Sequence, residues 1–381
     1  MVSTDTLYGA ELFINKTART REEIKEVADF LKLQMEHQKD FVVPADKFHL
    51  VPTDNGVKAA IDIGGAYGTP LYDIRPLAHN QIGVLAGVPG AYYDRCLTAS
   101  PPLLCDNVNR WFPASGRTHL VRVMGDHVRA VMSDRYLPLD NFDLFYSCLK
   151  VRKEIEGLNI IRVQMSESRF FLAFVNEQWA EDVYQDVTVN GTYTRLQLGK
   201  VAPLVTVVNS ETGKAGLSVA IGTFEMICLN ENVWMNQLAR RHIGRSQEVG
   251  FVSPETRKLE AELIWATVRD AIRAAFDQDK FTAMVEQMRV GASLIVEEPT
   301  KAVEVVAKQF MLSQQEQDDL LNEFTSPTVN VPHGPSILAL GQAFSYLATQ
   351  NEDADRAFDL QQAAGWVIEK GRELVPVRVR S

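Results

Sequence analysis

Cysteine is scarce in this chain, and long apolar runs are absent. The 381 residues contain four cysteines, none in a C-x-x-C pair, which argues against a disulfide scaffold and a zinc knuckle. Seven histidines show no H-x-x-x-H or H-E-x-x-H spacing, so we expect no metal site. No run approaches the roughly 18 apolar residues that cross a bilayer, and the first residues lack a signal-peptide layout. We therefore expect a soluble, intracellular protein with no membrane partner.

Motifs for phosphate binding and nucleophilic catalysis are also missing. Neither G-x-x-x-x-G-K-S/T, G-x-G-x-x-G nor G-x-S-x-G occurs. The glycine-rich stretch Ile63–Gly68 lacks the lysine of a phosphate cradle, and we interpret it as a turn. The polar stretch Ser210–Gly213 separates two apolar runs, which predicts a hairpin connection whose polar residues serve the turn. We expect neither catalytic residues nor a cofactor.

Three carboxylates lie close together in the sequence, at Asp134, Asp140 and Asp143. Clustered carboxylates hold the Mg²⁺ ions of some nucleases. Asp140 also stands where a predicted helix needs an N-cap, and Asp143 falls in its first turn, where it favours the helix dipole. These structural roles explain the group better, so a metal-dependent nuclease is the third of three functional hypotheses.

Local patterns predict alternating helices and hairpins in the first 110 residues. The chain is 46% hydrophobic and 23% charged, as in one large or two ordinary globular domains. Thr20 and Glu23 have capping-box spacing and open a helix over 21–39. Alternation on both sides of Thr53–Gly56 predicts paired strands. Short helices are predicted at 76–86, 90–97 and 103–111.

From residue 117 onward the apolar period changes to two. A hairpin around Gly125–Asp126 and a second over 158–176 flank a helix predicted at 141–155. Further strands are predicted at 186–189, 194–198, 203–209 and 216–230. Beyond Pro254 helical spacing takes over, with a capping box at Ser313 and Glu316, helices at 336–349 and 353–371, and a loop at 325–336. We predict an α+β fold, with a largely antiparallel mixed sheet and packed helices in residues 1–250 and a helical region in 251–381.

Charge is unevenly distributed along an acidic chain. The formal net charge is −10, yet residues 95–169 carry 11 basic and 8 acidic side chains. Many such cations pair within the molecule or line a solvated face, but aromatic rings among them also favour a groove for single-stranded nucleic acid. A second basic cluster follows at 240–245. The candidate phosphate contacts are Arg129, Arg135, Lys150, Arg152, Lys153, Arg162, Arg240, Arg241 and Arg245. Trp111 and Tyr136 are the candidates for base stacking.

Four stretches look familiar: LAGVPGAYYDRCL at 85–97, SDRYLPLDN at 133–141, SETG at 210–213 and ARRHIGR at 239–245. In this order and spacing they resemble the phage/plasmid-like protein family called domain of unknown function 932, over most of the chain up to about residue 255. The resemblance implies a mobile-element protein that acts in the cytoplasm of a bacterial host. The family carries no established catalytic residues, so the resemblance implies a setting rather than a reaction.

The predicted order of elements is similar to the core of the phage single-strand annealing recombinases, the Red-beta, RecT and Erf class. That analogy implies a homo-oligomer that holds single-stranded DNA in a basic groove and pairs strands in recombination without ATP. Our leading hypothesis is therefore a phage or plasmid DNA-metabolism protein. The alternative is a non-catalytic interaction protein or host-defence antagonist that binds a phage or host protein through residues 251–381, which carry 13 basic and 20 acidic side chains.

Overall fold

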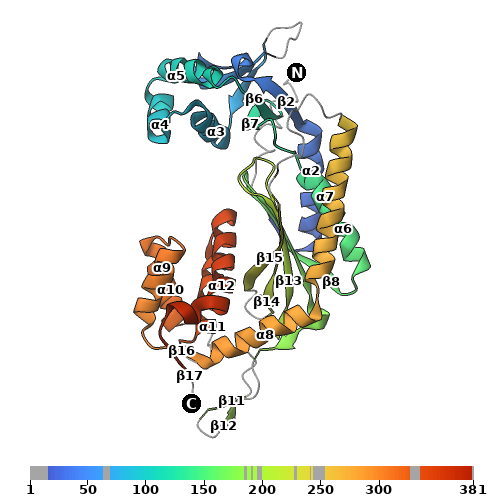
Figure 1. The fold of residues 1–381 in the computed structure, drawn as a ribbon, viewed down its shortest axis with the longest axis vertical. Coiled ribbons are helices and arrows are strands. Elements are labelled where there is room, and N and C mark those ends of the chain that lie inside the picture. Colours follow the sequence, from blue (N-terminus) through green and yellow to red (C-terminus); the bar gives the residue numbers. More distant parts are fainter. Residues whose placement is uncertain are drawn as a thin grey trace.

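The computed structural model describes residues 16–62, 69–183, 187–189, 192–194, 200–226, 230–240, 242, 254–326 and 335–379. Two mostly antiparallel sheets with helices form the first two-thirds of the chain, and a mainly helical part follows (Figure 1). The predicted α+β class is confirmed. The turn predicted at 63–68 and most of the loop predicted at 325–336 lie outside the described residues.

A six-stranded sheet with three helices forms one end of the elongated molecule, the upper end in Figure 1. Its strands are β2 Gln38–Pro44, β3 Phe48–Thr53, β4 Gly56–Ile61, β5 Leu71–Ile74, β6 Thr118–Met124 and β7 His127–Ser133. The order is β2-β6-β7-β5-β4-β3, and the β5–β7 pair is parallel. Helices α3 (Pro76–Ala86), α4 (Gly90–Ala99) and α5 (Pro101–Ala114) share its core. Both hairpins predicted in this region are confirmed.

A seven-stranded antiparallel sheet forms the middle of the molecule. Its strands are β1 Lys16–Ala18, β8 Leu158–Met165, β9 Phe170–Asn176, β10 Glu181–Asp182, β13 Lys200–Asn209, β14 Leu217–Glu225 and β15 Glu231–Arg240. The order is β1-β8-β9-β13-β14-β15, with β10 also paired to β13. The sequence predicted one strand over 216–230 and none after it, whereas β14 ends at Glu225 and β15 pairs with it. A separate hairpin joins β11 (Val187–Val189) to β12 (Thr192–Thr194).

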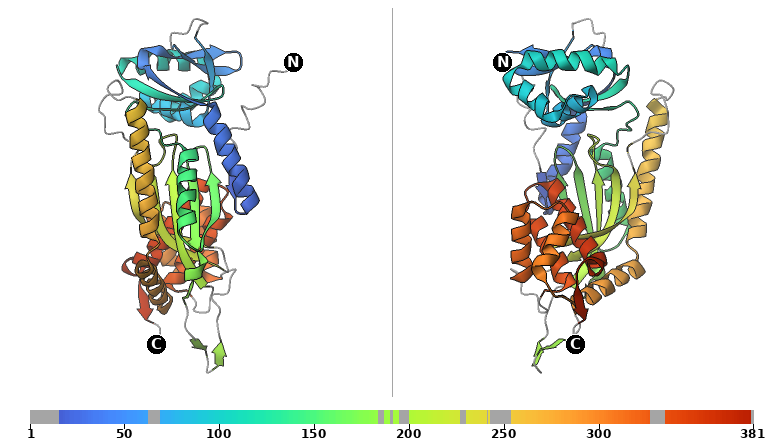
Figure 2. Two further views of the ribbon diagram at one scale, coloured as in Figure 1. Left: turned by 90° about the vertical axis from the view of Figure 1, so that its right-hand side faces the viewer. Right: turned by 60° about the vertical axis from the view of Figure 1, so that its left-hand side comes forward.

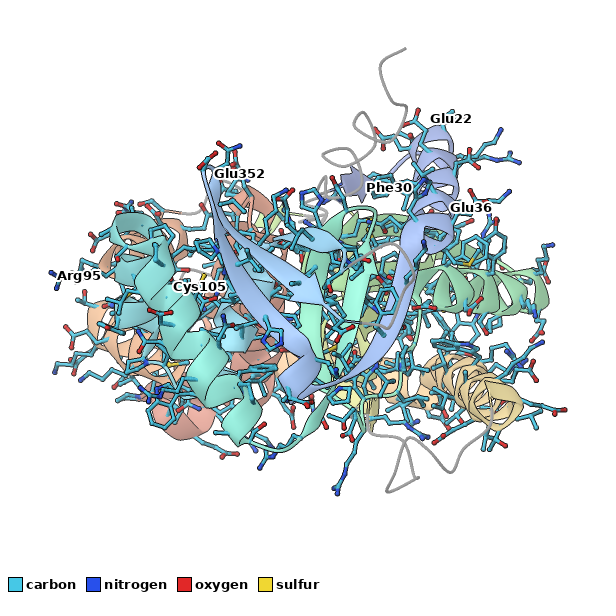
Figure 3. The ribbon with its side chains drawn as sticks, turned by 90° about the horizontal axis from the view of Figure 1, so that it is seen from above. Glu22, Phe30, Glu36, Arg95, Cys105 and Glu352 are labelled. Atoms are coloured by element: carbon cyan, nitrogen blue, oxygen red, sulfur yellow. The ribbon has the colours of Figure 1, made fainter. Side chains whose placement is uncertain are left out.

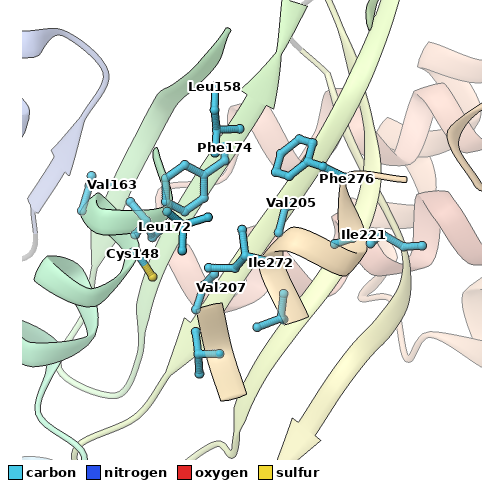
Figure 4. Packing of buried hydrophobic residues seen from close by; sticks show 14 of the residues in the cluster. Cys148, Leu158, Val163, Leu172, Phe174, Val205, Val207, Ile221, Ile272 and Phe276 are labelled. Atoms are coloured by element: carbon cyan, nitrogen blue, oxygen red, sulfur yellow. The ribbon is translucent and has the colours of Figure 1, made fainter. Parts of the chain in front are cut away.

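Three helices cover one face of the seven-stranded sheet. They are α2 (Arg21–His37), α6 (Asn141–Glu154) and α7 (Pro254–Ala275), and Figure 2 shows them side by side. Leu172 and Val205 of the sheet pack with Cys148 of α6 and Ile272 of α7 in one buried cluster (Figure 4). The predicted capping box of α2 is present, since Thr20 accepts from the Glu23 amide and the Glu23 carboxylate accepts from the Thr20 amide. Asp277 caps the next helix, α8 (Gln278–Ser293).

The helical C-terminal part packs on the opposite face of this sheet (Figure 2). It comprises α9 Pro299–Gln309, α10 Gln314–Thr325, α11 Ile337–Gln350 and α12 Ala354–Leu374, with the short strands β16 Leu294–Val296 and β17 Val377–Val379. The second capping box, Ser313 with Glu316, is confirmed at the start of α10. Among the described residues no helix is both long enough and apolar enough to cross a membrane.

Close approach of α12 to β15 depends on a glycine. A Cβ atom at Gly365 would lie 2.2 Å from the carbonyl oxygen of Val233. We expect Gly365→Ala to lower the free energy of unfolding by about 1–3 kcal/mol, because the helix must move away from the strand. Gly90, at the start of α4, has open space around its Cβ position, so Gly90→Ala is the control and should not destabilise the protein. Thermal unfolding of both variants measures the difference, and equal melting temperatures would contradict the prediction.

Candidate functional site

Two of the predicted phosphate contacts lie inside the protein. Arg129 on β7 is 3% exposed, and its Nη1 lies 2.5 Å from Oε2 of Glu211. Arg162 on β8 is 4% exposed and donates two hydrogen bonds to Glu231, at 2.8 and 2.7 Å. Each guanidinium is already neutralised by a buried carboxylate, so neither can reach a phosphate in this fold. Assigning Arg129 and Arg162 to a DNA groove was therefore wrong.

The second basic cluster was expected to contact phosphates and Tyr136 to stack on a base, and the structure places Arg240 and Tyr136 differently. Arg240 lies 3.8 Å from Glu260, and its side chain is 28% exposed. Arg241 and Arg245 lie outside the described residues. Tyr136 stacks on His242, with ring centroids 5.0 Å apart, and its hydroxyl donates to the carbonyl of Ser210. Since burial lowers the pKa of His242 to about 4, this partner is a neutral ring. Tyr136 is thus a packing residue rather than a free stacking platform.

The remaining four cations are exposed, but only three of them lie together. Lys150, Arg152 and Lys153 occupy the last turns of α6, and within the described part of the chain none pairs with a carboxylate. We call these three residues the α6 cluster. Arg135 precedes the same helix, which spans 14 residues or about 21 Å. The cluster also suits the negative end of the helix dipole, so its position has a structural reason as well.

Trp111, a candidate for base stacking, is exposed and stands beside further arginines. Its side chain is 56% exposed on α5, next to the exposed Arg110, and Arg117 lies exposed just beyond the helix. Neither arginine makes an ion pair with a described residue. We call Arg110, Trp111 and Arg117 the α5 surface. Asp106, also exposed, is the single carboxylate on this helix.

Contacts on the inner side of α5 fix the direction in which Trp111 points. Val108 and Phe112 are buried, and Phe112 packs against Phe48 of β3 with ring centroids 5.1 Å apart. The Asn109 side chain bonds both the amide and the carbonyl of Leu50, at 2.7 and 2.8 Å. Because residues 108, 109 and 112 face the sheet, helical geometry directs residue 110 outward and leaves residue 111 on the flank of the helix, where Trp111 is exposed. Figure 3 looks onto this end of the molecule, where Arg95 of the neighbouring α4 projects from the rim.

Sequence reasoning missed Arg110 and Arg117 as members of a site. They were counted in the basic segment, but nothing distinguished them from Arg129 or Arg162. The spacing of the apolar residues along this helix is the signal that could have identified the exposed arginine. The apolar positions Leu104, Val108 and Phe112 recur every four residues, which places Arg110 on the opposite side of the helix.

The most highly charged interior region joins the two sheets. Arg122 on β6 is 0% exposed and holds Asp40 of β2 through two hydrogen bonds, at 2.8 and 2.7 Å. Its Nη1 lies 3.1 Å from Asp140, at the start of α6. Glu211 comes from the β13–β14 hairpin and accepts from the Asn141 amide at 2.6 Å. Together with Arg129, these side chains form the charged junction.

The charged junction corrects two interpretations. The hairpin at Ser210–Gly213 is present, but Glu211 is 6% exposed and serves the junction rather than the turn. Burial acts to raise the pKa of Glu211, yet Arg129 and Arg122 hold it below its ordinary value, so the carboxylate stays ionised. Asp140 occupies the N-cap position of α6 without capping it, because its side chain pairs with Arg122 and accepts from Gln38 at 2.9 Å.

The junction offers salt bridges rather than a metal centre. Within the part of the chain that the structure describes, no group of three or more His, Cys, Asp or Glu side chains is arranged to hold a metal ion. Arg122 supplies the positive charge beside Asp140. Comparison of the chain with protein-family models, with curated proteins and with solved structures finds no match.

Proposed function

We propose that this protein binds single-stranded DNA without catalysing a reaction, with the α5 surface as the position where a base stacks. The observation that carries the proposal is the exposure of Trp111 on a rigidly held helix, between two arginines that have no carboxylate partner among the described residues. Proteins that bind single strands without sequence preference combine an aromatic ring for the base with cations for the backbone. The α5 surface supplies both.

The α6 cluster contributes phosphate contacts in this proposal. Its three cations lie on the seven-stranded sheet unit, whereas the α5 surface lies at the far end of the six-stranded sheet unit (Figure 1). Because α5 and α6 lie on opposite sides of the molecule, a bound strand that reaches both would have to pass around its side (Figures 1 and 3). The phage or plasmid setting that the sequence resemblance implies is part of this proposal, and strand annealing in recombination would require several copies of the chain along one strand.

We expect Trp111→Ala to weaken the binding of a fluorescein-labelled single-stranded oligonucleotide by roughly 5- to 150-fold, the effect of removing one stacked base. The salt dependence of binding should stay as steep as in the unchanged protein, because stacking releases no counterions. Fluorescence anisotropy at several salt concentrations measures both quantities. Leu259→Ala removes a similarly exposed apolar side chain from α7 and is the matched control. Unchanged affinity in the Trp111 variant would contradict the proposal.

Charge reversal in the α6 cluster should change the salt dependence of binding, which the Trp111 variant leaves unchanged. Replacing Arg152 and Lys153 by Glu is expected to lower both the affinity and the slope of its logarithm against the logarithm of salt concentration, by about 0.7 for each phosphate that the variant no longer neutralises. Asp106→Asn should strengthen binding, since it removes the carboxylate nearest to Arg110 along α5. If the affinity of the unchanged protein for single-stranded DNA does not depend on ionic strength, the proposed mode of binding is ruled out.

A further inference from the structure

A cavity of about 370 Å³ lies where the helical part meets the seven-stranded sheet. Its walls come from β15, from the end of α9 and from one side of α12, and the lining residues include Trp234, Phe310 and Trp366. Phe310 and Trp366 meet edge to face, with centroids 5.4 Å apart. Sites for small molecules are typically roughly 300–1,000 Å³ with mainly apolar walls and a few polar groups. The size and the rings fit a flat organic ligand.

Met311 forms part of this cavity in an unusual conformation. It is the one non-glycine residue with positive φ (50°) among the described residues, and its side chain is 86% exposed. A left-handed residue after a helix is ordinarily glycine, because a Cβ atom is strained there. An exposed methionine at this position gains no packing within the chain. Its flexible thioether is suited to cover a ligand in the cavity.

The polar groups of the cavity are both donors and acceptors. Arg356 binds Glu316 through Nε and Nη2, at 2.6 and 3.0 Å, which leaves Nη1 as a donor. Asp359 accepts from Arg169 through Oδ1 at 3.3 Å, which leaves Oδ2 as an acceptor. The lining thus carries one cation and one anion, each already paired.

We propose that this cavity binds a guanine base. A lining with one cation and one anion favours a ring that carries both acceptors and donors, and the aromatic walls provide stacking surfaces. Guanine presents O6 and N7 acceptors, which suit the Nη1 of Arg356, and N–H donors, which suit the free oxygen of Asp359. The base can belong to a free nucleotide or to a strand whose base is turned out. The proposal stands independently of the α5 surface, because no residue is shared.

Isothermal titration calorimetry with guanosine monophosphate tests the proposal on the full chain. We expect saturable binding that is at least tenfold tighter than binding of adenosine monophosphate, whose six-position offers a donor where guanine offers an acceptor. Asp359→Asn should weaken the binding of guanosine monophosphate at least tenfold. Asp318→Asn makes the same charge change on the exposed side of α10, away from the cavity, and should bind like the unchanged protein.

The source of the base is decided in a Trp111→Ala background. If adding Asp359→Asn to this background weakens the binding of a guanine-containing oligonucleotide as well as that of guanosine monophosphate, the cavity takes a base from a strand. If it weakens only the binding of guanosine monophosphate, the cavity takes a free nucleotide. Absence of saturable binding by both ligands overturns the proposal, and so does equal affinity for the guanine and adenine nucleotides. If the Asp359 variant is unstable, Met311→Gly provides the second test, because it removes strain and the covering thioether together. Met311→Gly should weaken the binding of guanosine monophosphate without lowering the melting temperature of the protein.

Discussion

Replacement of Arg122 by methionine is expected to lower the free energy of unfolding by about 3–5 kcal/mol. The guanidinium has no exposed surface and neutralises Asp40 and Asp140 at once. Methionine fills much of the same volume, so the main loss is electrostatic. The variant leaves two carboxylates, close to the ionised Glu211, with Arg129 as the remaining cation of the junction.

Urea denaturation at pH 7 measures this loss. Burial raises the pKa of Asp140, so that carboxyl takes up a proton readily, and the effect of losing Arg122 should be smaller in mildly acidic solution. Arg117→Met is the matched control, since this exposed arginine immediately precedes the same strand, and it should change stability by less than about 0.5 kcal/mol. A stability of the Arg122 variant within about 1 kcal/mol of the unchanged protein would show that the junction contributes little.

The second large effect concerns Glu225 at the end of β14. The side chain is 2% exposed and has a single partner among the described residues, Gln342, whose amide donates to it at 3.2 Å. Burial raises its pKa from 4.5 to about 7. Between these two pH values the unfolded chain releases the proton while the folded chain retains it. Stability therefore falls as pH rises through this window, and the loss is complete above pH 7.

Glu225→Gln should remove this pH dependence. A rise in pKa from 4.5 to about 7 corresponds to about 3 kcal/mol, so the variant should be more stable than the unchanged protein by that amount at pH 8. At pH 4 both forms are neutral at this position, and the two proteins should have similar stability. Denaturation at both pH values gives the comparison. Glu297→Gln, at an exposed position, should produce no such difference, and the same result at residue 225 would falsify the prediction.

Most of the fold could be predicted because its signals are local. The two capping boxes lie within four consecutive residues each, and the hairpins at 53–56 and 125–126 follow from turn residues between alternating strands. Strand β15 gave no such signal. Its Asn232 is buried, and its side chain accepts from Ser345 of α11, a partner 113 residues away. A polar residue satisfied by a distant helix disrupts the apolar alternation on which strand prediction depends.

The candidate site was harder to predict because the fate of an arginine depends on distant partners. Arg129 meets Glu211 across 82 residues, and Arg162 meets Glu231 across 69. Nothing near either arginine in the sequence indicates that it is buried. The exposed Trp111 was identified because aromatic and basic residues are adjacent there. The cavity at Met311 had no sequence signal, since its walls come from three separate elements.

The pairing of β16 with β17 has a consequence for the order in which the protein is completed during translation. Leu294–Val296 and Val377–Val379 form one antiparallel ladder, and four helices lie between them in the chain. This ladder cannot form until residue 379 has left the ribosome, whereas all strands of the seven-stranded sheet are synthesised by residue 240. During that interval the apolar face of β9, β13 and β14, which is buried in the complete protein, is not yet covered by α12. Newly made chains are then most exposed to aggregation and to chaperone binding on this face of the sheet.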